Sequence, residues 1–168
     1  NLGGYFATVM LALLLHAFVT QMAILRLFTG LSISMFLRKI RAVQIFAFST
    51  SSSGATIPVT LRTVQERLGV DRAVSSFTIP FGATINMDGT AIMQGVATVF
   101  VANLYGIELG LAGYVTIVLT AVLASIGTAA VPAVGLVMLT LVFKQVGLPI
   151  EAIGIILGID RIVDMTRT

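Results

Sequence analysis

The chain has 168 residues, of which 57% are hydrophobic and only 10% are charged, and its mean hydropathy is +1.05. Soluble domains have about 25% charged residues, so this composition excludes an ordinary water-soluble domain and indicates a protein surrounded by lipid. The net charge of +3 does not indicate nucleic acid binding, because seven of the ten basic residues fall between Arg26 and Arg72. The absence of cysteine excludes disulfides and thiolate metal sites within these residues.

Residues 1–30 predict a transmembrane span. No charged residue occurs from Asn1 to Leu25, and about 20 apolar residues in a helix are enough to cross the hydrocarbon core. The stretch lacks the basic leader and the cleavage site of a signal peptide, so we expect the protein to extend before Asn1. His16, the only histidine, is interpreted as a satisfied interior or interface residue rather than as a proton relay.

Residues 31–70 predict a re-entrant hairpin that opens to the cytoplasm. The uncharged run from Ala42 to Leu61 has basic residues on both sides, and the positive-inside rule therefore places both of its ends in the cytoplasm. The stretch from Ser49 to Pro58 is rich in hydroxyl side chains, glycine and proline, which make a poor helix interior. The chain is therefore expected to turn back within the membrane at this stretch.

Residues 71–105 predict a transmembrane span with an unwound centre. Asp88 lies between two long uncharged runs, and a carboxylate at that depth costs several kcal/mol unless it is paired or bound to a cation. Asn86, Gly89 and Thr90 beside it favour an unwound turn whose oxygens could hold a cation such as Na⁺. The alternative is a buried acid that a neighbouring helix satisfies.

Residues 109–146 predict a second re-entrant hairpin, on the extracellular side. The uncharged run from Leu109 to Phe143 would be about 52 Å long as one helix, whereas the hydrocarbon core is about 30 Å thick. Its expected break extends from Ser125 to Pro132, offset by 74 residues from the matching positions of the first hairpin. Such inverted repeats with interrupted hydrophobic segments indicate a transporter site near the bilayer midplane.

Residues 149–168 predict the start of a last span, which we expect to continue beyond Thr168. Asp160, Asp164 and Arg167 are spaced by four and three residues, so they share one helical face. Arg167 could simply neutralise Asp164. Alternatively, the pair could bind the amino group and the acidic side chain of one zwitterionic ligand.

Four stretches of the sequence together resemble the signatures of the dicarboxylate/amino acid:cation symporter family. They are Ser51–Thr60, Gly82–Thr90, Ser125–Ala129 and Asp160–Thr168, and the resemblance covers essentially the whole chain. It implies an all-α integral membrane transport domain, built from an inverted repeat of a re-entrant helical hairpin followed by a broken transmembrane helix.

The resemblance also implies two sets of site residues. The substrate set lines the pocket through backbone groups, the Thr90 hydroxyl, the Asp164 carboxylate for the amino group and the Arg167 guanidinium for the side-chain carboxylate. The cation set supplies side-chain and carbonyl oxygens. The substrate residues are Ser51, Ser52, Thr90, Val131, Gly135, Asp164, Arg167 and Thr168, and the cation residues are Gly82, Thr84, Asn86, Asp88, Ser125, Ile126 and Thr128.

The function implied by the resemblance is secondary active symport of glutamate or aspartate with Na⁺ and/or H⁺ by alternating access. The protein is expected to be a multi-pass protein of the plasma or inner membrane and not an enzyme, with no cofactor beyond the coupling ions. Its expected partners are the substrate, the cations, the lipid bilayer and N-terminal scaffold spans outside this chain, and the full-length protein is expected to form a homotrimer. C4-dicarboxylates, neutral amino acids or cystine remain alternative substrates.

The sequence departs from the family pattern at two places, and two other functional classes remain as alternatives to a transporter. The chain stops before an asparagine and an aspartate of the last span, and Thr50 stands where some members have an arginine. An intramembrane hydrolase could use a serine of Ser51–Ser53 with His16 as base, although no G-x-S-x-G spacing is present. An ion channel could also use re-entrant loops, as selectivity filters do.

Overall fold

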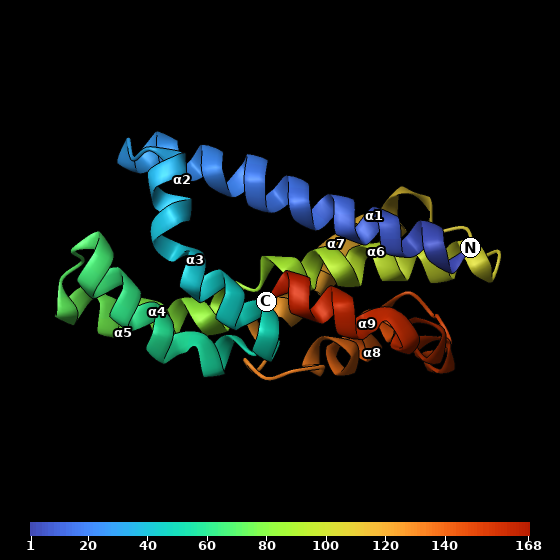
Figure 1. The fold of residues 1–168 in the computed structure, drawn as a ribbon. Coiled ribbons are helices and arrows are strands. Elements are labelled where there is room, and N and C mark those ends of the chain that lie inside the picture. The colour runs from blue at the N-terminus through green and yellow to red at the C-terminus, as the bar shows by residue number, and fades with distance from the viewer.

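The computed structural model describes residues 1–168, and every regular element in it is helical, which confirms the predicted all-α class (Figure 1). In chain order the elements are α1 (Leu2–Leu15), the π-helical turn η1 (His16–Gln21), α2 (Met22–Thr29), α3 (Ile33–Thr50), α4 (Ser53–Leu68), α5 (Arg72–Ile85), α6 (Asp88–Leu104), α7 (Gly110–Ile126), α8 (Val134–Gln145), the 3₁₀ turn η2 (Ile150–Ala152) and α9 (Ile153–Arg167).

The first three elements form one continuous helix of 28 residues, Leu2–Thr29, which lies along one side of the molecule in Figure 1. This helix is the one that is long and apolar enough to cross a membrane by itself. It ends where Gly30 adopts a left-handed conformation with φ of 65°, which glycine reaches without steric cost. The segment predicted as a span over 71–105 does not meet that criterion, because it is divided into α5 and α6.

The α3–α4 hairpin turns at Ser51 and Ser52. Ser51 has a left-handed φ of 52°, and the Ser52 side chain caps α4 by accepting a hydrogen bond of 3.1 Å from the Ala55 amide. The break is therefore narrower than the predicted stretch from Ser49 to Pro58. Pro58 lies inside α4, where it removes one backbone hydrogen bond without ending a helix that the serine cap has already started.

Helices α5 and α6 are separated by Asn86 and Met87 alone. Both residues leave helical geometry, with ψ near 51°, and the Met87 carbonyl accepts hydrogen bonds from the amides of Thr90 and Ala91. No backbone amide donates to the Asn86 carbonyl. The turn thus leaves an unpaired carbonyl next to Asp88, the first residue of α6.

Helices α7 and α8 form the second hairpin, and their connection covers residues 127–133. Ala133 closes it in a left-handed conformation with φ of 61°, an uncommon geometry for a residue with a Cβ. The structure shifts the expected break by only one or two residues from the predicted Ser125–Pro132.

The apolar core is built from α1, α6, α7, α8 and α9, and the α3–α4 hairpin and α5 extend beyond it in Figure 1. Val9, Met93, Leu139 and Ile156 are each fully buried in it. This core holds the end of α9 and the start of α6 next to both hairpin turns. The residues that the sequence singled out therefore converge near the middle of the molecule.

Candidate functional site

A cavity of about 800 Å³ lies where the two hairpin turns, the Asn86–Met87 break and the end of α9 meet the N-terminal helix. Its volume falls within the range of about 300–1,000 Å³ that is typical of small-molecule sites. Eight of the sequence-predicted site residues line it: Ser51, Asn86, Asp88, Thr90, Val131, Asp164, Arg167 and Thr168.

The Asp164 carboxylate lies on the wall of this cavity and makes three hydrogen bonds. Its Oδ1 accepts from Arg167 Nε at 2.9 Å and Nη2 at 2.6 Å, and its Oδ2 accepts from the Ala133 amide at 2.8 Å. The Asp164 and Arg167 side chains are only 5% and 4% exposed. This buried, two-point ion pair therefore connects α9 to the turn of the α7–α8 hairpin.

Gly135, the second residue of α8, provides space for the Arg167 guanidinium. A Cβ at Gly135 would lie 2.7 Å from Arg167 Cζ, so a larger residue would displace the arginine. The Gly135 carbonyl accepts a hydrogen bond of 3.3 Å from Gln94 Nε2 on α6, and the Gln94 side chain is fully buried. Sequence reasoning missed Gln94, although a polar amide within an apolar helix is a signal that could have identified it.

The two hairpin turns touch each other at the Ala130 carbonyl. This oxygen accepts hydrogen bonds from the Gly54 amide at 2.9 Å and from Ser52 Oγ at 3.0 Å. A Cβ at Gly54 would lie only 2.9 Å from the same oxygen, so the close approach requires glycine there. Ser52 thus adjoins the cavity as a link between the turns.

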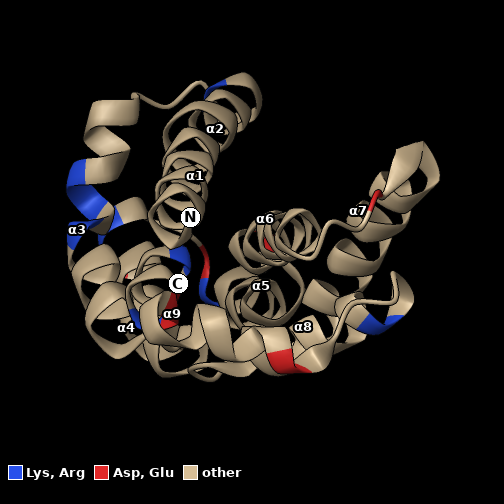
Figure 2. Cartoon of the chain, turned by 90° about the vertical axis from the view of Figure 1, so that its right-hand side faces the viewer, with Lys and Arg blue, Asp and Glu red and all other residues tan.

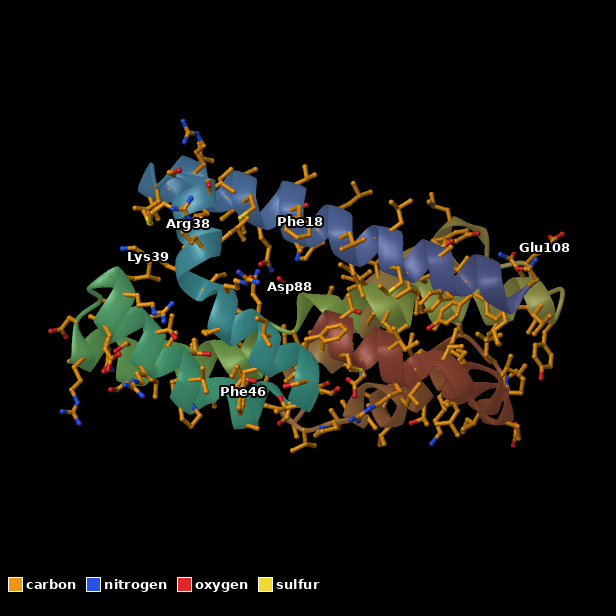
Figure 3. The ribbon with its side chains drawn as sticks, viewed as in Figure 1. Phe18, Arg38, Lys39, Phe46, Asp88 and Glu108 are labelled. Carbon is orange, nitrogen blue, oxygen red and sulfur yellow. The ribbon has the colours of Figure 1, made fainter.

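Asp88 contacts the N-terminal helix across the cavity, and Figure 3 places it beside that helix. Its Oδ2 lies 3.1 Å from His16 Nε2 and 3.2 Å from Gln21 Nε2. His16 is therefore engaged by Asp88 and makes no hydrogen bond to Ser51, Ser52 or Ser53, so the structure does not assemble the nucleophile and base of the rival hydrolase hypothesis. Sequence reasoning also missed Gln21.

Five of the predicted cation residues do not line the cavity, namely Gly82, Thr84, Ser125, Ile126 and Thr128. The hydroxyl groups among them are satisfied within their own helices: Thr84 Oγ1 donates to the Pro80 carbonyl, and Thr128 Oγ1 donates to the Ala124 carbonyl. The lone pairs of these hydroxyls and of the backbone carbonyls are the groups that these residues could offer a cation. Gly82 and Thr84 lie near the end of α5, Ser125 and Ile126 end α7, and Thr128 lies just beyond α7; α5 and α7 contact each other.

The sequence of the whole chain, residues 1–168, matches the sodium:dicarboxylate symporter family. The chain belongs to this family. It is 42% identical over 167 residues to an excitatory amino acid transporter of Caenorhabditis elegans, 43% identical over 168 residues to excitatory amino acid transporter 4 of Rattus norvegicus, and 41% identical over 168 residues to excitatory amino acid transporter 2 of Homo sapiens. These alignments cover 99–100% of the chain.

The chain spans about a third of the length of these relatives, from 29% of the human protein to 33% of the nematode protein. This chain contains the cavity and both hairpin turns. The resemblance inferred from the four signature stretches is thereby confirmed.

Proposed function

We propose that the full-length protein is a secondary active symporter that takes up glutamate or aspartate together with Na⁺ and/or H⁺. The single observation that supports this most strongly is the buried pair of Asp164 and Arg167 on the cavity wall. One anionic and one cationic group within a single helical turn suit a ligand with both charges only a few ångströms apart. An acidic amino acid is such a ligand.

The substrate would exchange its own charges for those of the internal pair. Its ammonium group would take the place of Arg167 at the Asp164 carboxylate, and its side-chain carboxylate would bind the guanidinium in a bidentate manner. Both protein charges are thus compensated before and after binding, which avoids the large cost of a buried unpaired charge. A C4-dicarboxylate has no ammonium group for the Asp164 carboxylate, and a bare ion can pair with only one of the two protein charges.

Asp88 and the Asn86 carbonyl would form part of the coupling site for the cation, with Thr90 nearby on the substrate side. A carboxylate and a free carbonyl are hard oxygen ligands of the type that Na⁺ requires when it loses water. Gly82 would contribute a carbonyl oxygen to one cation site. Thr84, Ser125, Ile126 and Thr128 would contribute carbonyl oxygens to another cation site, between α5 and α7. The contact between these two helices supports that assignment.

In the membrane, residues 1–30 would span the bilayer, 31–70 and 109–146 would form re-entrant hairpins from opposite sides, and 71–105 and 149–168 would form broken or partial spans. Large apolar side chains such as Leu27, Leu111 and Leu123 are at least 70% exposed, as expected for surfaces that meet lipid or the N-terminal scaffold spans.

The charged residues indicate the orientation in the membrane. Arg38 and Lys39 lie near one end of the molecule and Glu108 at the other, with Asp88 between them (Figure 3). Basic residues also gather on α3 in Figure 2, which supports a cytoplasmic location for that end. The full-length protein would reside in the plasma or inner membrane as a homotrimer.

The experiment is uptake of radiolabelled aspartate and glutamate by the purified full-length protein in liposomes, with and without an inward Na⁺ gradient. We expect saturable uptake of both amino acids that the gradient accelerates. Large unitary currents without substrate would instead support an ion channel. Uptake of succinate without aspartate uptake would assign the site to C4-dicarboxylates.

A further inference from the structure

The N-terminal helix places two polar side chains on Asp88 that belong to neither predicted set of site residues. His16 Nε2 and Gln21 Nε2 approach the same carboxylate oxygen, Oδ2, at 3.1 and 3.2 Å. No hydrogen bond reaches the other oxygen, Oδ1. Asp88 therefore has one anchored oxygen and one free oxygen beside the cavity.

A π-helical turn brings the two side chains together. His16 and Gln21 are the first and last residues of η1, and in a regular α-helix residues five apart would point about 140° away from each other. The i→i+5 hydrogen bonds of a π turn instead bring such residues toward one face. No glycine or proline occurs between Tyr5 and Thr29 to cause the irregularity. Single π turns inside α-helices occur frequently at functional sites.

The chemistry of the three groups determines the direction of each hydrogen bond. An ionised carboxylate only accepts, so His16 must donate from Nε2, and the Gln21 amide nitrogen can only donate. The 3.3 Å separation between Gln21 Nε2 and His16 Nε2 therefore joins two donors and is not a hydrogen bond in this arrangement. Both side chains donate to Asp88 Oδ2.

We propose that His16 and Gln21 are positioning residues for the coupling cation, which hold Asp88 Oδ2 so that Oδ1 and the Asn86 carbonyl face the ion. This inference rests on the proposed function. Two donors on one oxygen fix the rotation of the carboxylate, so the cation does not have to order it on binding. Outer partners of this kind orient metal ligands generally, and their removal weakens metal affinity even though they never touch the ion.

The test measures binding of radiolabelled Na⁺ to the purified full-length protein, and the Na⁺ dependence of aspartate uptake in liposomes. In Gln21→Leu and His16→Leu, we expect the Na⁺ concentration for half-maximal binding to rise roughly tenfold. Maximal uptake at saturating Na⁺ and aspartate should be retained, because the cation ligands themselves are intact. His16→Gln, which keeps an N–H donor, should restore most of the affinity.

Thr20→Val is the matched control, because Thr20 is exposed in the same π turn and makes no side-chain hydrogen bond. Unchanged Na⁺ affinity in both leucine variants would overturn the inference, and so would an equal loss of Na⁺ binding in His16→Gln and His16→Leu. If the unaltered protein binds Na⁺ with an affinity that Gln21→Leu weakens, yet transports no amino acid, only the proposed function fails.

Discussion

At the scale of single residues, the cavity is organised around charges that compensate each other. The Asp164 carboxylate is held by the Arg167 guanidinium and by the Ala133 amide, and nearly all of its surface is buried. Breaking such a pair by removing one partner is costly, because the remaining charge stays buried. A ligand that brings its own complementary charges can replace the internal contact without this cost.

Gly135→Ala should weaken acidic substrates selectively. The new methyl group would overlap the guanidinium, which lies within 2.7 Å of that position, and overpacking of this kind costs about 1–3 kcal/mol. We expect the concentration of aspartate for half-maximal uptake to rise roughly tenfold. Gly158→Ala on α9 is the control, since a Cβ there meets nothing within 4 Å. Equal behaviour of the two variants would show that Arg167 does not depend on this space.

Asp88→Asn should weaken the cation first and the substrate second. Asparagine keeps the size of the side chain but removes the charge that offsets dehydration of the ion, and linked ligands lose affinity reciprocally. The measurement is the Na⁺ dependence of aspartate binding. If that dependence is the same in Asp88→Asn as in the unaltered protein, Asp88 has only a structural role.

The sequence predicted the local relationships of these residues better than their long-range contacts. The spacing of Asp164 and Arg167 was sufficient to place them together, because a helix brings residues three apart onto one face. The spacing predicted neither the hydrogen bond from the Ala133 amide to Asp164 nor the hydrogen bond from Gln94 to the Gly135 carbonyl. These contacts join different helices and depend on how the whole core is packed.

At the scale of the elements, the two hairpins meet turn to turn, and their contact at the Ala130 carbonyl forms part of the cavity boundary. Hydroxyl-rich stretches and excess length predicted both breaks. They did not predict that α4 would continue through Pro58. The break lies at the Ser52 cap, where α4 starts, and not at the proline. The π turn at His16–Gln21 had no sequence signal at all.

Gly54→Ala should separate the two hairpin turns and make the cavity more accessible. The added Cβ would lie 2.9 Å from the Ala130 oxygen, which is too close to be tolerated without movement. We expect Met165→Cys, inside the cavity, to react several-fold faster with a charged thiol reagent when Gly54→Ala is also present. The comparison requires a cysteine-free background of the full-length protein. Ala55→Ser in the first turn of α4 is the control, and equal labelling rates would show that the contact between the two hairpin turns does not restrict access to the cavity.

At the scale of the whole molecule, charge separation follows the long axis. Arg38 and Lys39 lie near one end and Glu108 at the other, with Asp88 between them (Figure 3). The clustering of basic residues between Arg26 and Arg72 predicts that the end with Arg38 and Lys39 lies in the cytoplasm, and that orientation stays a prediction. The sequence could not predict which helices form the core, since large apolar side chains are also exposed along α1, α7 and α8, and an apolar sequence therefore does not distinguish core surfaces from outer ones.

Uptake should be driven by the membrane potential. An acidic amino acid carries a net charge of about −1, which an inside-negative potential opposes by about 2.3 kcal/mol per 100 mV, and one monovalent cation would only cancel this. We therefore expect at least two cations per substrate. Aspartate uptake should slow when the potential of the liposomes is clamped to zero. An uptake rate that does not change with the membrane potential would exclude a ratio of two or more cations per substrate.

Recognition of an acidic side chain by Arg167 is tested most directly by a competition series with Arg167→Cys in the full-length protein. Loss of a buried charge-assisted contact costs roughly 2–5 kcal/mol, so aspartate and glutamate affinities should fall by well over tenfold. Serine or alanine binding should appear or improve, because the Asp164 carboxylate would still hold an amino group. Arg161→Cys, an exposed arginine on the same helix, should leave the preference unchanged. A retained preference for aspartate over serine in Arg167→Cys would contradict the assignment and leave Arg167 as only the internal partner of Asp164.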